Sequence, residues 1–535
     1  MARSTKLVLL IAAIAALMLS FPLFAHLEGR DAPDIRILTE SEYADLLSRQ
    51  EGTPDSAVFG SLLICGEIAP YDAAGNTFYV PVALEDLDFL SELSWSDKNL
   101  TAYFAPDALF AAPDKAVADG HVFQLIVTNG RRYHTESVVF TGLPAITLHT
   151  ESEKSYVYED GVPTGTLKAF YPTAGAYEVK TSIATFRPRG NTTAKFDKTP
   201  RRICLYLPNR EKNYTSLCGM REDDDWILNS LYTDSSKLRD KLSIDLWNAI
   251  AESNPGHDIC GAKMKYVEVF VDDSYEGLYG LVEPIGKKST KLNTACDILY
   301  QAKSFLLREE DFAAARSSLG FFAIEIKYPK KWTGEALWDP ITDYVDCFYW
   351  NRDGYTADEM RSFLDLENAV DHTLFLQAAT ATDNFFHNTY FLARPQSDDT
   401  WKLTKIPWDL NYSFGDRWDD YIENLFTAFD PELISSDQTT KDVKALLERD
   451  PEGMGKLLSD RWAELRASVL SDEAMESAIQ TQSRAILTSG ALFRDGIRWP
   501  DEGNADEAAE ITAFTKARLA YLDGYYALLS AGGAS

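Results

Sequence analysis

The amino-acid sequence predicts an α+β protein in which β-rich segments come first and helices come last. Short apolar runs alternate with turn residues up to about residue 148. An amphipathic helix and a hairpin pattern follow, and from Ala357 onward apolar residues recur at helical spacing. The 535 residues, of which 45% are hydrophobic, are enough for more than one core. We therefore expect a small all-β domain ahead of a larger mixed domain that ends in helices.

The N-terminus has the features of an export signal. Basic residues occur up to Lys6, and an uncharged run then extends from Leu7 to Ala25, which as a helix would measure about 28 Å. The small residue at the end of Leu23–Ala25 fits a cleavage site, so signal peptide and uncleaved membrane anchor both remain open for residues 1–33. In either case we expect the rest of the chain to be extracytoplasmic.

Residues 34–144 are expected to form the β-rich accessory domain. Its predicted strands are Val58–Cys65, Thr77–Val82, His121–Val127 and Ser137–Phe140. Asn129-Gly130 lies between two of these runs and predicts a tight hairpin, because both residues tolerate the left-handed conformation that such turns need. The segment carries no obvious reacting group, so we predict a spacer or binding module.

Residues 145–535 are expected to form the second domain. Strands continue to about Leu207, and the helix Ser235–Ala251, capped by Asp234 or Ser235, leads to a hairpin of Lys265–Val271 and Gly277–Val282. The predicted later helices are Ala357–Ala381, Lys441–Leu487 and Glu507–Leu529.

Charge and cysteine content limit the partners. A formal net charge of -30 repels polyanions, so nucleic acid is not expected to bind, whereas basic protein segments are attracted. Six cysteines include no CxxC pair, which argues against structural zinc. Export would permit disulfides, of which Cys204 with Cys218 is the nearest pair, and the connectivity stays open.

One pair of polar residues has the spacing of a phosphoryl-transfer loop. Asp383 and Asn388 lie five positions apart directly after an apolar helix, the offset between the base and the metal-binding Asn in kinase catalytic loops. Asp409 follows the strand-like run Trp401–Ile406, as the metal-binding Asp of kinases does. Taken singly, Asp383 could instead cap a helix or hold a turn, and Trp408 could be an ordinary core aromatic.

Five motifs in order resemble the CotH kinase family of atypical protein kinases. They are Arg189–Thr193, Asp234–Arg239, Gly277–Glu283, Asp383–Asn388 and Pro407–Asp409. The resemblance covers roughly Ala145 to Leu529. It implies an atypical protein-kinase-like two-lobed fold with a helical C-terminal lobe, in which the N-lobe spans about 145–285 and the C-lobe about 286–535.

The resemblance also implies roles for individual residues. Asp383 becomes the catalytic base that positions the acceptor hydroxyl, and Asn388 and Asp409 become ligands of Mg²⁺ or Mn²⁺. Many members carry a second Asp where this chain has Asn411, which we keep as a third metal candidate of lower charge.

The nucleotide side of the site is less sharply defined by the sequence. Six cations crowd around the Arg-Gly-Asn-Thr segment, and from these we select Arg189 and Lys198 for the ATP phosphates. A solvated, structurally paired basic face is the alternative. Glu283 ends the second hairpin strand, where it could bond the nucleotide or merely cap the segment.

Together these features predict a secreted or membrane-anchored transferase, a Mg-ATP-dependent kinase that phosphorylates Ser or Thr of surface or spore-coat proteins. A catalytically silent surface protein that binds or assembles other coat proteins remains the alternative, as does transfer to a glycan. The oligomeric state is left open.

Overall fold

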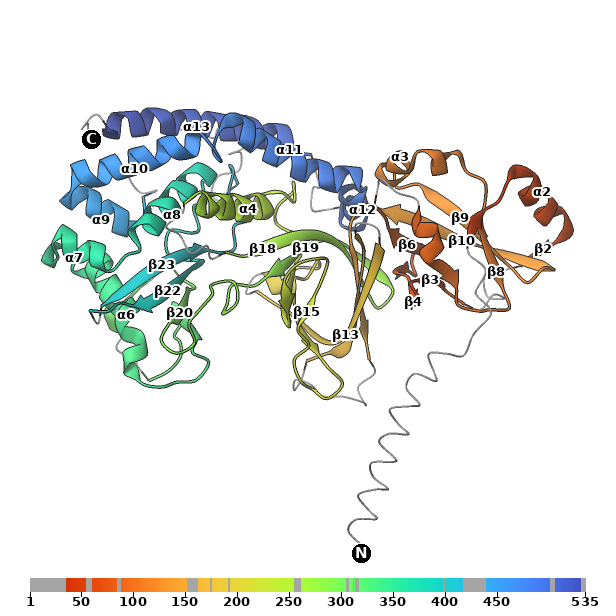
Figure 1. The fold of residues 1–535 in the computed structure, drawn as a ribbon, viewed down its shortest axis with the longest axis horizontal. Helices are drawn as coiled ribbons and strands as arrows, with labels where there is room; N and C mark the ends of the chain where they lie inside the picture. The colour runs from red at the N-terminus through yellow and green to blue at the C-terminus, as the bar shows by residue number, and fades with distance from the viewer. Residues whose placement is uncertain are drawn as a thin grey trace, which may run out of the picture.

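The computed structural model shows a mixed α+β protein made of three sheet assemblies joined by a layer of helices (Figure 1). The residues it describes are 35–53, 60–83, 88–151, 162–173, 176–190, 193–254, 261–304, 307–310, 312, 317–398, 400–416, 439–500 and 506–530. Among these residues no helix has the length and apolar content needed to cross a membrane. The predicted export segment at residues 7–25 lies outside them.

The N-terminal domain is built on a seven-stranded sheet of order β1-β8-β9-β10-β6-β5, with β2 paired to β10, and a three-stranded sheet β4-β3-β7. The strands are β1 Arg36–Ile37, β2 Glu51–Gly52, β3 Leu62–Ile64, β4 Glu67–Ile68, β5 Tyr71–Asp72, β6 Thr77–Pro81, β7 Leu93–Trp95, β8 Thr101–Phe104, β9 Val122–Thr128 and β10 Arg132–Thr141. The prediction of an all-β domain was wrong in one respect, because helices α2 (Glu40–Arg49) and α3 (Pro113–Ala118) belong to it. A capping box between Thr39 and Glu42 starts α2.

The predicted Asn129-Gly130 hairpin is confirmed. Strands β9 and β10 pair antiparallel around it, and Gly130 has a φ of 86°. The Asn129 side-chain oxygen accepts the N–H groups of Arg131 and Arg132 at 3.0 and 2.9 Å, which closes the turn.

A closed barrel follows, with strands in the order β11-β12-β13-β14-β17-β19-β18. The strands are β11 Ala145–Thr150, β12 Thr164–Thr173, β13 Ala176–Pro188, β14 Arg201–Tyr206, β17 Asp225–Asn229, β18 Lys263–Val271 and β19 Ser274–Glu283, and a small hairpin of β15 Thr215–Ser216 and β16 Glu222–Asp223 lies beside them. Alternate residues such as Leu167, Trp226 and Tyr279 fill its interior. The parallel pairing of β11 with β18 closes it, so residues far apart in the sequence share one wall.

Helix α4 (Arg239–Glu252) packs on the outer face of the barrel. It begins four residues later than the sequence predicted, because Lys237 adopts a φ of 60° that a helix does not tolerate. Asp234 still acts at this end, since its carboxylate accepts the Arg239 N–H at 2.8 Å. Arg239 also forms buried ion pairs with Asp234 and Glu507, which tie the start of α4 to the start of α13.

The third assembly is a four-stranded antiparallel sheet of order β21-β20-β22-β23. Its strands are β20 Ile298–Ala302, β21 Ile324–Tyr328, β22 Thr389–Pro395 and β23 Trp401–Pro407. The associated helices are α6 Asp339–Val345, α7 Ala357–Ser362, α8 Leu366–Ala379, α9 Lys441–Arg449, α10 Pro451–Arg466, α11 Asp472–Thr488, α12 Ala491–Arg498 and α13 Ala508–Ser530. The helical segment predicted for 357–381 therefore holds two helices, the stretch predicted for 441–487 holds three, and α12 was not predicted.

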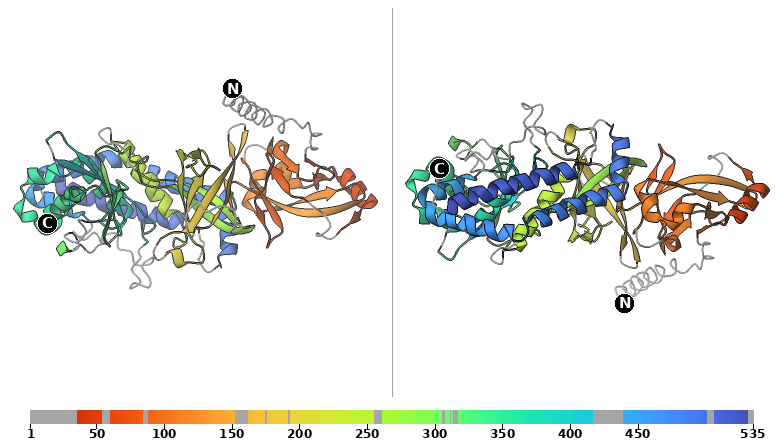
Figure 2. Two further views of the ribbon diagram at one scale, coloured as in Figure 1. Left: turned by 90° about the horizontal axis from the view of Figure 1, so that it is seen from below. Right: turned by 90° about the horizontal axis from the view of Figure 1, so that it is seen from above.

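The last helices form a layer that runs along the molecule from the four-stranded sheet to the barrel (Figure 2). At its far end α12 reaches the junction with the N-terminal domain. The buried Arg494 side chain bonds Glu268 of β18 at 2.8 and 2.9 Å and the Thr141 hydroxyl of β10 at 2.9 Å. One side chain thus joins the last strand of the N-terminal sheet to the barrel.

Candidate active site

The candidate site forms at one end of the hairpin β22–β23. Thr389 pairs with Pro407 at this end, so Asn388 immediately precedes one strand and Trp408 immediately follows the other. The Trp408 N–H donates to the Asn388 carbonyl at 2.9 Å. The two loops that the sequence singled out are therefore held side by side by ordinary sheet pairing.

Asp383 and Asn388 are in direct contact. The Asn388 amide donates to Asp383 Oδ2 at 2.8 Å, and His387 Nδ1 lies 3.0 Å from Asp383 Oδ1. Both oxygens of the buried carboxylate are thus oriented by neighbours in the same loop. The five-residue spacing works because the loop turns back on itself, with Asn388 at a φ of 55°.

A residue missed by the sequence analysis supports this loop. The Asn384 side chain is fully buried, and its amide donates to the Trp408 carbonyl at 2.6 Å and to the Asn388 carbonyl at 3.3 Å. It thereby links the Asp383 loop to the residue before Asp409. Its place inside the motif was visible in the sequence, but its partners were not.

Asp409 presents a carboxylate for which the described residues show no hydrogen bond or ion pair. Its φ of 60° is a left-handed conformation, which an Asp tolerates better than most residues. Although the residue keeps surface exposure, the protein atoms crowded around its carboxylate desolvate it and raise its pKa. Arg189 opposes this rise and Asp383 adds to it, which places both charges within electrostatic reach.

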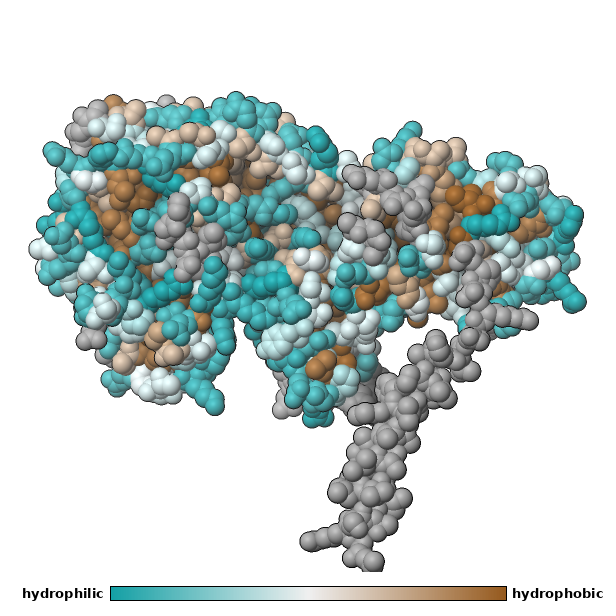
Figure 3. Space-filling model, in the orientation of Figure 1, coloured by the Kyte–Doolittle hydropathy of each residue, from teal (hydrophilic) through white to brown (hydrophobic). Residues whose placement is uncertain are grey.

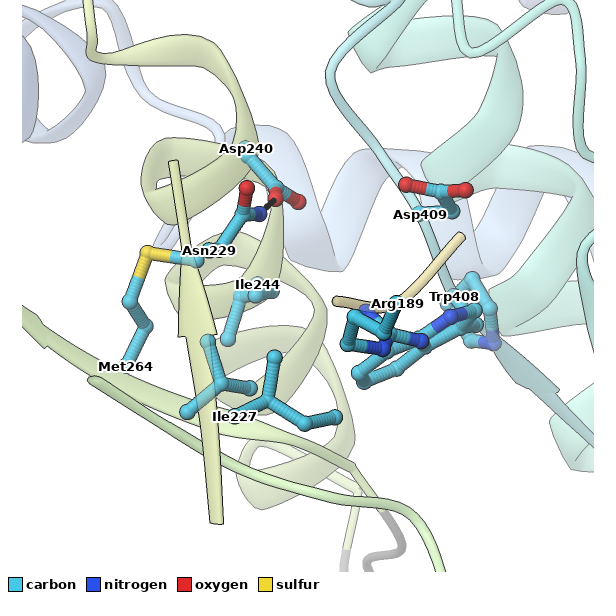
Figure 4. A pocket seen from close by; sticks show the side chains of 10 residues that line it. Arg189, Ile227, Asn229, Asp240, Ile244, Met264, Trp408 and Asp409 are labelled. Atoms are coloured by element: carbon cyan, nitrogen blue, oxygen red, sulfur yellow. Dashed lines mark hydrogen bonds between the residues drawn. The ribbon is translucent and has the colours of Figure 1, made fainter. Parts of the chain in front are cut away.

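A pocket separates Asp409 from the barrel. Its lining residues are Arg189, Ile227, Asn229, Asp240, Ile244, Met264, Val282, Pro407, Trp408 and Asp409. Figure 4 shows Asp409, Trp408 and Arg189 on one side and Asp240 with Asn229 on the other. The Arg189 guanidinium lies over the Trp408 ring, 5.6 Å from its centre, so a residue that follows barrel strand β13 reaches the loop after β23.

Asp240 is the second functional candidate that the sequence analysis missed. It is 4% exposed on the first turn of α4, its Oδ2 accepts the Asn229 amide, and its Oδ1 accepts the Leu410 N–H at 3.2 Å. Burial and the facing Asp409 raise its pKa to about 7. No sequence signal marks it, since an Asp in the first turn of a helix is a common stabilising residue.

Cations of the barrel act electrostatically on residues of the four-stranded sheet. Burial raises the pKa of Tyr390 on β22, Arg189 and Arg202 oppose that rise, and Glu325 and Asp409 increase it. Burial lowers the pKa of Lys327 on β21, Glu325 opposes this, and Arg202 on barrel strand β14, itself ion-paired with Asp225, lowers it slightly further. In the space-filling view the surface is hollowed between the barrel and the four-stranded sheet, on the side away from the helix layer (Figure 3).

Three of the predicted site residues have side chains that bind other residues of the fold. Lys198 is 0% exposed and pairs with Asp495 at 2.7 Å, so its ammonium does not line the pocket. Glu283 is buried against Arg221, which lies 3.3 Å away. The Asn411 amide donates to the Thr233 hydroxyl at 3.0 Å, and this residue, like Asp383 and Asn388, does not line the pocket.

Cys204 and Cys218, the nearest cysteines in the sequence, are both free thiols. Within the described part of the chain, no three His, Cys, Asp or Glu side chains come together as a ready metal site. This does not conflict with a site for Mg²⁺, which is usually held by one or two protein carboxylates while water and phosphate oxygens complete its shell. The Asp409 carboxylate, which has no hydrogen bond or ion pair among the described residues and lies near Asp383, fits that kind of donor set.

The family comparison agrees with this geometry. The family described as CotH kinase protein matches residues 186–522, a stretch that includes Arg189, the whole Asp383–Asn388 loop and Asp409. Comparison with curated proteins finds no match. Because the matched segment covers more than half of the sequence, the chain belongs to the CotH kinase family.

Proposed function

We propose that this protein is a Mg-ATP-dependent protein kinase that acts outside the cytoplasm on Ser or Thr residues. The observation that carries the proposal is the meeting of Asp383, Asn388 and Asp409 at one end of the β22–β23 hairpin, opposite Arg189 of the barrel. In phosphoryl transfer, catalysis depends mainly on positioning and on stabilising charge, and this set supplies groups for both.

On this proposal the barrel serves as the N-lobe and the four-stranded sheet with its helices as the C-lobe. The apolar side chains of Ile227, Ile244, Met264 and Val282 line the barrel side of the pocket. Arg189 and Asp409 lie on the opposite side, whereas Asp240 lies on the same side as these apolar residues. A lining of both apolar and charged groups offers contacts for a base and for phosphates.

The residues then divide the work. Asp383, oriented by His387 and Asn388, accepts the proton of the Ser or Thr hydroxyl. Asp409 and the Asn388 side-chain oxygen would hold the divalent ion, whose chemistry is to neutralise phosphate charge. Arg189, steadied by its contact with Trp408, orients the phosphates from the barrel side.

The acceptor class and location follow from charge and the N-terminus. A net charge of -30 favours basic Ser- or Thr-containing segments of surface or spore-coat proteins. Residues 1–33, as a signal peptide or membrane anchor, would place the enzyme where such proteins are found.

The test is transfer of ³²P from labelled ATP by the purified full-length protein, with Mg²⁺ or Mn²⁺, onto itself and onto basic Ser-rich peptides. Asp383→Asn and Asp409→Asn should each abolish transfer. Asp353→Asn, at a carboxylate that is 95% exposed, is the matched control and should transfer normally. No transfer by the folded wild-type protein with either metal would overturn the proposal in favour of a binding scaffold. Transfer to glycans alone would overturn the protein acceptor.

A further inference from the structure

Helix α4 and the turn before it hold the loop that carries Asp409. The Asp240 carboxylate accepts the Leu410 N–H at 3.2 Å, and one turn further along the helix the Ser243 and Ser413 hydroxyls lie 2.8 Å apart. Asn411 bonds Thr233, just before α4, at 3.0 Å. The Asp409 loop is therefore fixed against α4 at several successive points.

The Asp240 contact acts directly on Asp409. The Leu410 N–H belongs to the peptide unit that follows Asp409, so an acceptor at this N–H sets the plane of that unit. Asp409 itself has a φ of 60°, which is unfavourable for a residue with a side chain unless surrounding contacts hold it. Asp240 supplies one such contact and thereby helps to hold the backbone from which the Asp409 side chain projects.

The charge of Asp240 is balanced only from a distance, because Arg189 lowers its pKa slightly without forming an ion pair with it. The residue is 4% exposed, it accepts hydrogen bonds from the neutral Asn229 amide and Leu410 N–H, and among the residues described no ion pair joins it to a cation. Figure 4 shows it across the pocket from Asp409, a second carboxylate. Two carboxylates that face each other across a pocket repel each other, and the arrangement becomes favourable when a cation enters.

We propose, on the basis of the kinase function above, that Asp240 is a positioning residue for the divalent ion. It orients Asp409 through the Leu410 N–H and adds the second negative charge that Asn411, turned toward Thr233, does not provide. Asp240 need not touch the metal in this role. Its charge acts across the pocket and its hydrogen bond acts through the backbone.

Three variants separate charge from hydrogen bonding. Asp240→Asn keeps a side-chain oxygen for the Leu410 N–H but removes the charge. Asp240→Ala removes both. Asp245→Asn, on the same helix at a half-exposed carboxylate that pairs with Lys241, is the matched control. The full-length proteins are compared in Mg²⁺ dependence of ATP turnover, in Mn²⁺ binding without nucleotide followed by electron paramagnetic resonance, and in melting temperature.

Asp240→Asn should raise the Mg²⁺ concentration for half-maximal rate about tenfold and weaken Mn²⁺ binding similarly, with kcat changed little. Asp240→Ala should lower kcat as well, because Asp409 loses its orientation. Unchanged Mg²⁺ dependence and Mn²⁺ binding in Asp240→Asn would overturn the inference, as would an equal effect of Asp245→Asn. If the Asn variant failed to fold, Asp240→Glu would replace it. Metal binding by Asp240→Glu that is as weak as that of Asp240→Ala would then overturn the inference. Mn²⁺ binding is measured without turnover, so the two proposals can fail separately. The role of Asp240 can fail while the kinase function holds, and it can hold while the kinase function fails.

Discussion

Lys198 distinguishes most clearly between the sequence pattern and the structure. The sequence pattern predicts that Lys198 binds the ATP phosphates, whereas in the structure its side chain forms a buried ion pair that stabilises the fold. Its ammonium is 0% exposed and lies 2.7 Å from Asp495 Oδ1 of α12. The same oxygen accepts the Leu278 N–H of β19 at 2.7 Å. Lys198→Met would leave the Asp495 charge buried without this partner.

The cost follows from the burial of both partners. Removing one member of a buried ion pair costs about 3–5 kcal/mol, because the remaining charge loses its compensation. For a cooperative unit of about 150–250 residues, each kcal/mol lowers the melting temperature by about 2–4 °C, so a fall of about 6–20 °C is expected. The double variant Lys198→Met with Asp495→Leu should recover part of this loss in stability. The recovery is incomplete because the Leu278 N–H then lacks its acceptor, which costs about 1–3 kcal/mol.

The assay is thermal unfolding by circular dichroism, paired with the KM for ATP. Lys195→Met, at an exposed lysine of the same segment, is the control and should change neither quantity. A Lys198→Met protein with an unchanged melting temperature and a raised KM for ATP would refute this reasoning. It would indicate that Lys198 binds the nucleotide.

Three further predictions concern the pocket and the joint between the sheets. The pKa of Asp240 is about 7 in the folded protein and 3.8 for the free group. Between these pH values the folded protein binds more protons than the unfolded chain, so its stability falls as the pH rises through this range. Asp240→Asn should remove this fall, and parallel melting curves from pH 5 to 8 would contradict it. Arg494→Met should leave the buried Glu268 charge without its partner and make the segment between β10 and β11 accessible to proteases. Limited proteolysis measures this, with Arg498→Met as the control. Gly277→Ala should destabilise the protein by about 2 kcal/mol or more, because φ is 104° and the new Cβ would lie 2.2 Å from Asp495 Oδ1, and an unchanged unfolding midpoint would argue against this packing.

The parts of the site that sequence reasoning reached are the local ones. Asp383 and Asn388 belong to a single loop, and Asp409 follows the strand that pairs beside it, so their meeting depends on one hairpin. Arg189 was selected from a crowded basic segment, and the structure does bring it to the pocket.

The remaining parts depend on contacts across long sequence separations, which no spacing encodes. Lys198 looks like any other cation in its segment until α12, far along the chain, brings Asp495 against it. Asp240 becomes a pocket residue only because α4 packs on the barrel and meets the loop after β23. The parallel pairing that closes the barrel is likewise invisible in strand patterns, which do not specify their neighbours.

The two adjacent charged residues of α12 limit how the N-terminal domain could be exchanged between related proteins. Arg494 secures the end of the N-terminal sheet, and Asp495 secures the loop that leads into β14. The N-terminal domain therefore rests on a helix encoded near the opposite end of the chain and is not a cassette that can be exchanged at the Thr141–Ala145 boundary alone. A chimera that swaps this domain would have to inherit a matching α12, and natural shuffling of the domain among relatives would face the same requirement.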